Sequence, residues 1–299
     1  MQPLPAFFAL ILLGAIFSRS TSAQPLLGAQ GAEGEPDREQ HWLVPTPDPD
    51  RPAHAVLFRP PGNGPFRLAL IAHASTQNAL RRAQMPRPEY RALAAFLVAR
   101  GFAVMVPERL GHGSTGGSYL EDQGGCDQAD YVRSGRATAQ QIAVVLQFLR
   151  GQAFIRRDHA IVVGHSAGGW GALALAGEDP TSVSAIIAFA PGRGGHAKDV
   201  ENQVCAPDRL IAAAAEFGRG ARVPVTWLVA ANDTFFSPDL SRQLADAFRS
   251  AGGKAVFSVL APTGSEGHWM AETEGGVTLA TPELDRALKL PQPVAARKR

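Results

Sequence analysis

From residue 67 to residue 260 the sequence alternates between short apolar runs and helical patterns, and this alternation is the strongest constraint on the fold. Each apolar run predicts a strand that is covered on both faces, and each helical pattern predicts the crossover to the next strand. Such alternation is typical of a mostly parallel sheet with helices on both faces, within one α/β domain. The predicted strands are residues 68–72, 102–106, 159–163, 183–189, 223–230 and 255–260, and the predicted helices are residues 90–100, 137–150, 168–176, 210–217 and 239–251.

The composition is that of a chain with a large core. Of the 299 residues, 45% are hydrophobic and 19% are charged, which excludes a disordered chain. With 29 basic and 27 acidic residues, the chain has no strong field to attract nucleic acid or anionic lipid. We therefore expect a small-molecule substrate and no nucleic-acid partner, and we interpret residues 291–299, which end in three basic side chains, as a solvated tail.

The first 23 residues have the pattern of a signal peptide. An unbroken apolar run covers residues 6–17, and the small residues Thr21 and Ala23 form a cleavage site ahead of Gln24. The run is too short to span a bilayer, which needs about 20 apolar residues. We predict export to the periplasm or the medium, with no membrane span in the mature protein. An uncleaved anchor remains the alternative, because no Lys or Arg precedes the run.

Residues 24–54 form a proline-rich segment ahead of the main domain, which we place at residues 55–290. Seven prolines lie between residues 45 and 65, and proline cannot donate to a strand ladder. This stretch predicts loops or strands at the edge of the sheet.

Cys126 and Cys205 are the two cysteines of the chain and lie 79 positions apart. Neither belongs to a C-x-x-C pair or has a histidine at zinc-finger spacing. In an oxidising compartment we expect them to form a disulfide, which would tie two loops at the rim of the pocket. Two unrelated buried thiols are the alternative.

The residues with catalytic potential follow the predicted strands. Gly164-His165-Ser166-Ala167-Gly168 stands between a strand and a helix, where G-x-S-x-G forms a sharp turn that exposes the serine hydroxyl. Ser166 is thus the predicted nucleophile. The backbone N–H of Ala167, at the start of the helix, is a predicted donor to an oxyanion.

A nucleophilic serine needs a base and a carboxylate that orients the base. Asp233 follows the strand that ends at residue 230, and His268 lies in the loop after the last strand. Asp233 as a turn former, and Glu266 or Asp239 in its place, remain alternatives, and His268 could be a surface histidine. We expect His165 to point away from the nucleophile.

With the order Ser166, Asp233, His268, the chain resembles the α/β-hydrolases over residues 55–290, and most closely the dienelactone-hydrolase-like or secreted esterase branch. The resemblance rests on the G-x-S-x-G motif, on residues 228–233 (LVAAND) and on residues 267–269 (GHW). It implies a second oxyanion donor, the backbone N–H of Ser75. No long helical insertion separates the preceding strand from Asp233, so we expect a small lid or none. Residues 107–114 are similar to a turn of that family, but we interpret them as a glycine-rich turn.

These residues predict a serine hydrolase that cleaves small or medium carboxylic esters through an acyl-enzyme. The resemblance implies no metal and no organic cofactor. A small peptidase or amidase of the same fold and a non-catalytic binding protein are the alternatives. Trp269 and Trp170 could line an acyl pocket, although large aromatic residues are more often part of the core.

Overall fold

The computed structural model describes residues 26–178 and 182–288, which form nine strands, seven α-helices and three short 3-10 turns. The strands are β1 (Gly28–Ala29), β2 (Gln40–Val44), β3 (Ala53–Phe58), β4 (Arg67–Ala72), β5 (Phe102–Pro107), β6 (Ala160–His165), β7 (Val183–Phe189), β8 (Val225–Ala230) and β9 (Ala255–Leu260). The helices are α1 (Ala79–Ala83), α2 (Arg91–Val98), α3 (Tyr131–Arg150), α4 (Ala167–Glu178), α5 (Pro207–Gly220), α6 (Pro238–Ser250) and α7 (Glu274–Leu288). The 3-10 turns are η1 (Cys126–Gln128), η2 (Ala197–Asp199) and η3 (Gly267–Glu272).

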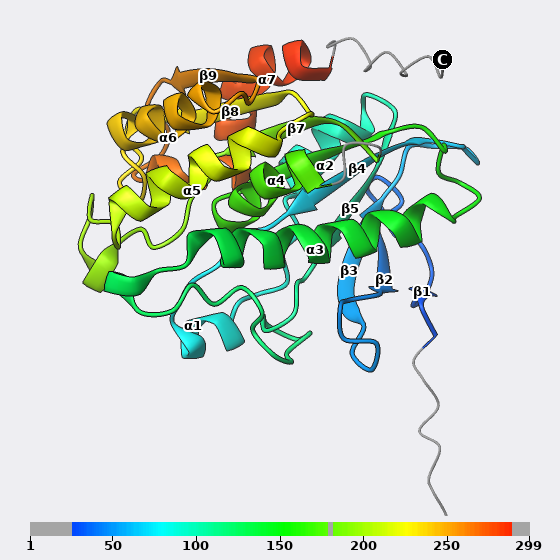
Figure 1. Cartoon of the computed structure of the whole chain (residues 1–299). Coiled ribbons are helices and arrows are strands. Elements are labelled where there is room, and N and C mark those ends of the chain that lie inside the picture. Colours follow the sequence, from blue (N-terminus) through cyan, green and yellow to red (C-terminus); the bar gives the residue numbers. More distant parts are fainter. Residues whose placement is uncertain (1–25, 179–181, 289–299) are drawn as a thin grey trace, which may run out of the picture.

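All nine strands belong to one sheet with the order β1-β2-β3-β5-β4-β6-β7-β8-β9 (Figure 1). From β5 to β9 every neighbouring pair is parallel, whereas β1, β2 and β3 join the edge next to β5 as antiparallel strands. The carboxyl ends of the parallel strands therefore meet at one end of the sheet, which is where ligands bind in sheets of this kind. The predicted mostly parallel α/β architecture is confirmed.

Helices cover both faces of the sheet, because the central strands are apolar on both sides (Figure 1). In β4, Leu68, Leu70 and Ala72 pack into the core beneath α3, α4, α5 and α6, while Ala69 and Ile71 pack into the core beneath α2 and α7. One strand thus contributes alternate side chains to two cores. Nearly every residue of the central strands is buried.

The five helices that were predicted from the sequence differ from those of the structure mainly at their ends. Helix α3 begins at Tyr131, well before the predicted residue 137, with the Asp130 side chain accepting a hydrogen bond from the Arg133 N–H at its first turn. After Tyr131, its first turns bury Ser134 and Gly135 rather than large apolar side chains, so an apolar pattern does not reveal them.

Helix α7 was not predicted from the sequence. It buries Val277, Ala280 and Leu284 against the sheet, but two glycines follow its first residue and it contains Pro282. Glycine and proline are the poorest helix formers. Burial of the apolar face outweighs their low propensity here.

Strands β1 and β2 lie within the proline-rich segment and pair with the same sheet as the main domain, at its edge. The division of the chain at residue 55 stays a prediction. The predicted signal peptide at residues 1–23 and the predicted tail at residues 291–299 lie outside the described residues. In the part of the chain that the structure describes, no helix is both long and apolar enough to cross a membrane.

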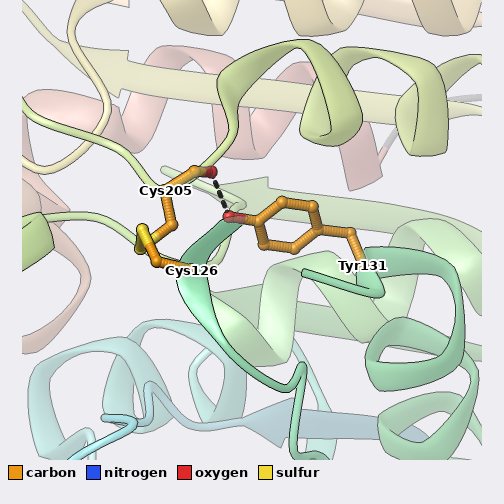
Figure 2. The surroundings of a disulfide bond; sticks show 3 residues. All are labelled: Cys126, Tyr131 and Cys205. Carbon is orange, nitrogen blue, oxygen red and sulfur yellow. Dashed lines mark hydrogen bonds between the residues drawn. A yellow bond between two sulfur atoms is a disulfide. The ribbon is translucent and has the colours of Figure 1, made fainter. Parts of the chain in front are cut away.

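Cys126 and Cys205 form a disulfide (Figure 2). Cys126 lies in η1, just before α3, and Cys205 lies just before α5. The Tyr131 hydroxyl donates a hydrogen bond to the Cys205 carbonyl, as Figure 2 shows, and the Cys205 N–H donates to the Gly194 carbonyl at 2.9 Å. The segment between β7 and α5 is thereby fixed to the start of α3. A disulfide is compatible with the predicted export.

The double variant Cys126→Ser/Cys205→Ser is expected to unfold more easily, because the unfolded chain loses a cross-link that closes a loop of 79 positions. The chain-entropy model gives a loss of about 4–5 kcal/mol in the free energy of unfolding. Urea titration of the native protein and the double variant measures this difference in the free energy of unfolding. Dithiothreitol should lower the midpoint of the native protein to a similar extent and leave that of the double variant unchanged. An unchanged midpoint of the native protein in dithiothreitol would contradict the prediction.

Candidate active site

Ser166 occupies the sharp turn between β6 and α4. Its φ is 53°, in the left-handed region that a side chain rarely adopts, and its N–H donates to the Phe189 carbonyl at 2.9 Å. The Ser166 carbonyl accepts from the Trp170 N–H at 2.9 Å, so the turn leads directly into the helix. Ala167 is the first residue of α4, where backbone N–H groups lack partners within the helix.

The two glycines of the motif allow backbones to approach closely. A Cβ at Gly168 would lie 2.0 Å from the Ala72 carbonyl oxygen, and a Cβ at Gly164 would lie 2.5 Å from the Gly169 Cα. Side chains at these two positions would therefore collide with β4 and with the first turn of α4.

The structure brings His268 and Asp233 together. The His268 Nδ1 donates to the Asp233 Oδ2 at 3.1 Å, and both side chains are buried. Asp233 Oδ1 accepts from the N–H groups of Phe235 and Phe236, at 2.9 Å each. Because a carboxylate only accepts, the Nδ1 of His268 carries the proton, and Nε2 is left to accept one from another group.

The two other candidate carboxylates have different positions. Glu266 Oε1 accepts from the N–H groups of His268 and Thr234, at 2.9 and 3.1 Å, so it joins the loops that carry His268 and Asp233. Asp239 lies in the first turn of α6. Of the three carboxylates, Asp233 is the one with a hydrogen bond to the imidazole of His268.

Aromatic rings hold the His268 imidazole in place. The Phe235 ring stacks on it with the centroids 4.3 Å apart, and the ring of His196 stacks on the other face of Phe235 at 3.5 Å. Burial lowers the pKa of His268 below its ordinary value of 6.5, and the nearby Asp233 carboxylate opposes part of this shift. The imidazole is therefore neutral at neutral pH.

Ser166, Ala167, His268 and Ser75 all line one cavity of about 460 Å³. Loops that follow β4, β6, β7, β8 and β9 contribute to it, so it lies at the carboxyl ends of the parallel strands. Its charged lining residues are Arg81, Arg193, Lys198 and Asp199.

The two tryptophans next to the motifs lie in different surroundings. Trp269 lines the cavity with 40% of its surface exposed, whereas Trp170 is fully buried in the core. The segment between β7 and α5, which contains η2 and Cys205, forms another wall of the cavity.

The loop His73-Ala74-Ser75 is fixed by its own histidine. The His73 Nε2 accepts from the Arg109 N–H at 3.0 Å, so the proton lies on Nδ1, which donates to the Ala74 carbonyl at 2.5 Å. Burial, together with the charge of Arg109, holds the pKa of His73 well below its ordinary value, so the ring stays neutral. The clamped peptide is the one that carries the N–H of Ser75.

A buried charge cluster beneath the cavity was missed in the sequence. The Glu121 carboxylate accepts from Arg109 and Arg193, and all three residues are buried. Burial alone would raise the pKa of Glu121, but the two guanidinium groups hold it well below its usual range. Arg109 belongs to the segment that we interpreted as a glycine-rich turn, and it also donates to the His73 carbonyl at 2.8 Å. The turn therefore supports the loop of Ser75.

Among the described residues, no group of three or more His, Cys, Asp or Glu side chains is placed to hold a metal ion.

The chain resembles a sequence family over part of its length and solved structures over most of it. The sequence model of the family described as serine aminopeptidase, S33, matches residues 88–214, which include Ser166 but neither Asp233 nor His268. No curated protein sequence matches the chain.

Solved structures resemble nearly the whole chain. The esterase Pf2001 of Pyrococcus furiosus has a TM-score of 0.58 at 11% identity and covers 88% of this chain and 98% of its own. A Klebsiella pneumoniae protein described as a dienelactone hydrolase has a TM-score of 0.52 at 16% identity, with 85% and 99% covered. A puromycin-hydrolyzing peptidase of Mycobacterium tuberculosis has a TM-score of 0.55 at 15% identity, with 83% of this chain and 39% of its own covered. Together with the sheet order and the turn at Ser166, these matches establish that the chain is an α/β-hydrolase in fold.

Gly168→Ala is expected to destabilise the protein by about 3 kcal/mol, because overpacking against a backbone carbonyl cannot be relieved by a rotamer change. The matched control is Gly275→Ala in α7, where no atom beyond the adjacent residues and the helix's own backbone lies within 4 Å of the added Cβ. That change should be neutral or stabilise by up to about 1 kcal/mol. Urea unfolding compares the two variants. If Gly168→Ala were as stable as Gly275→Ala, the close approach of Gly168 to Ala72 would be contradicted.

Proposed function

We propose that the protein is a serine esterase that cleaves small or medium carboxylic esters. The observation that carries the proposal is the cavity itself, which is lined by the strained Ser166 and by His268, whose Nδ1 is held by Asp233. A serine hydroxyl, a neutral imidazole and an orienting carboxylate are the components of acyl transfer.

In the proposed mechanism, the Nε2 of His268 takes the proton of the Ser166 hydroxyl as its oxygen attacks the ester carbonyl. The N–H groups of Ala167 and Ser75 bind the oxyanion that forms. His268 then gives the proton to the departing alcohol, and the acyl group remains on Ser166. Water, deprotonated by His268, attacks the acyl-enzyme, and the acid is released as the hydroxyl of Ser166 is restored.

A peptidase of the same fold is the second candidate, because the matching family is described as serine aminopeptidases. An aminopeptidase has to bind a protonated amine near its nucleophile. The charged residues that line the cavity are three cations and one carboxylate. Asp199 is paired with Arg81 at 3.0 Å, and Arg193 is paired with the buried Glu121. The described lining therefore offers no unpaired carboxylate to bind a protonated amine, which favours a neutral or anionic substrate.

The proposed esterase activity predicts that p-nitrophenyl esters from acetate to butyrate are hydrolysed faster than the octanoate. It also predicts that these esters are hydrolysed faster than the p-nitroanilides of single amino acids. Ser166→Ala should lower kcat by at least about 10⁴-fold, because the nucleophile is lost.

The matched control is Ser75→Ala, which changes a second serine of the same cavity but keeps its backbone N–H. It should keep kcat within about tenfold, because the change removes only the bonds of the Ser75 hydroxyl to His112 and Tyr119. Faster turnover of anilides would favour the peptidase. If the native protein cleaved neither the esters nor the anilides, the alternative of a binding protein would be favoured. Full activity of Ser166→Ala would rule out Ser166 as the nucleophile.

The pH profile provides a second prediction. His268 must be neutral to accept the proton, and its pKa is lowered by burial, so the neutral form persists below pH 6.5. The acid limb of kcat/KM should therefore have its midpoint below 6.5. The variant Asp233→Asn removes the carboxylate that raises the pKa of His268. It should move the midpoint to a lower pH and lower kcat by about 10⁴-fold.

Asp239→Asn is the control, because this carboxylate lies on α6 and is not the one bonded to His268. Its profile should match that of the native enzyme. A native midpoint above pH 7 would contradict the proposed state of the imidazole.

A further inference from the structure

Three loops of the site meet at one buried hydroxyl, that of Tyr90. This residue directly precedes α2, is 6% exposed and has a φ of 50°. Its oxygen lies 3.1 Å from the Ala74 nitrogen, 2.9 Å from the His165 Nδ1 and 3.2 Å from the Glu272 Oε1. These partners belong to the loop of Ser75, to the turn of Ser166 and to η3, which carries His268.

The network continues from His165 to the proposed base. The His165 Nε2 lies 2.8 Å from the backbone carbonyl of His268, and the ring is fully buried. A carbonyl only accepts, so this nitrogen carries a proton. Both ring nitrogens of His165 are therefore occupied.

The proton positions follow from the chemistry of each partner. The Ala74 N–H donates to the Tyr90 oxygen, which leaves the phenolic proton for His165 or for Glu272. With a neutral His165, Tyr90 donates to the Nδ1. With a protonated His165, the Nδ1 donates to Glu272 at 3.1 Å, and Tyr90 does the same at 3.2 Å. The bonds to Ala74 and to the His268 carbonyl are identical in both states.

We propose that Tyr90 and His165 are positioning residues, which together set the distance between the oxyanion loop and the catalytic base. The inference rests on the proposed esterase function. Neither side chain is among the residues that line the cavity of Ser166. Each acts through another group: Tyr90 holds the peptide nitrogen next to Ser75, and His165 holds the backbone of His268. An error of a fraction of an ångström in either position lowers the rate of the chemical step.

The test compares Tyr90→Phe with Tyr131→Phe. Both changes remove one buried hydroxyl that bonds to the backbone, but the partner of Tyr131 is the Cys205 carbonyl rather than a catalytic loop. Steady-state kinetics use p-nitrophenyl butyrate, and phosphorylation by diethyl p-nitrophenyl phosphate counts the reactive serines. We expect Tyr90→Phe to lower kcat by about 10- to 100-fold with KM within about twofold, and Tyr131→Phe to leave both constants near native values.

His165 provides the second arm and keeps the test decisive if Tyr90→Phe does not fold. His165→Gln retains an N–H that can reach the His268 carbonyl, whereas His165→Leu does not. We expect the Gln variant to keep at least about tenfold more kcat than the Leu variant. The double variant Tyr90→Phe/His165→Leu should be no slower than the worse single variant, because residues that act as one unit are not additive.

Three results would overturn the inference. One is native kcat in Tyr90→Phe, and another is equal kcat in the Gln and Leu variants. The third is a higher KM at an unchanged kcat, which would mean that Tyr90 contacts the substrate through a second cavity of about 510 Å³ that it lines. A native enzyme that neither cleaves the ester nor reacts with the phosphate would instead refute the proposed function.

Discussion

The site depends on one close contact between backbones, where the first turn of α4 crosses the end of β4 at Gly168. Without a side chain at this point, the helix comes near enough to β4 to bring Ser166, the N–H of Ala167 and the loop of Ser75 to one cavity. The left-handed φ of Ser166 is the strained part of this turn. Burial of the strands on both faces stabilises the sheet that bears the strain.

Much of the fold and the main candidate residues could be predicted because their signals are local. The buried strands are mostly apolar runs, and Ser166 and Asp233 each follow one. His268 follows β9, the apolar edge strand, whose residues are partly exposed rather than buried as predicted. The supporting groups carry no local signal. Tyr90 lies 182 positions from Glu272, and Glu121 lies 72 positions from Arg193, so these pairs are visible only in the folded chain. Helix α7 was missed for a different reason, since tertiary burial overrides its glycines and Pro282.

Around the proposed catalytic residues, most of the polar side chains form hydrogen bonds with backbone groups of the loops. Glu266 bonds to the N–H of His268, His73 to the Ala74 carbonyl, and Asp233 to two N–H groups of its own loop. Each loop is thus fixed where it would otherwise be free to move. Such fixed loops lower the cost of reorganisation when charge develops in a reaction.

The disulfide has a consequence for the covalent topology of the chain. Ser166 lies between Cys126 and Cys205, inside the loop that the bridge closes, whereas Asp233 and His268 lie outside it. A single cut of the backbone between the two cysteines would therefore leave both fragments covalently joined. The peptide that bears Ser166 would stay attached to the part of the chain that bears Asp233 and His268.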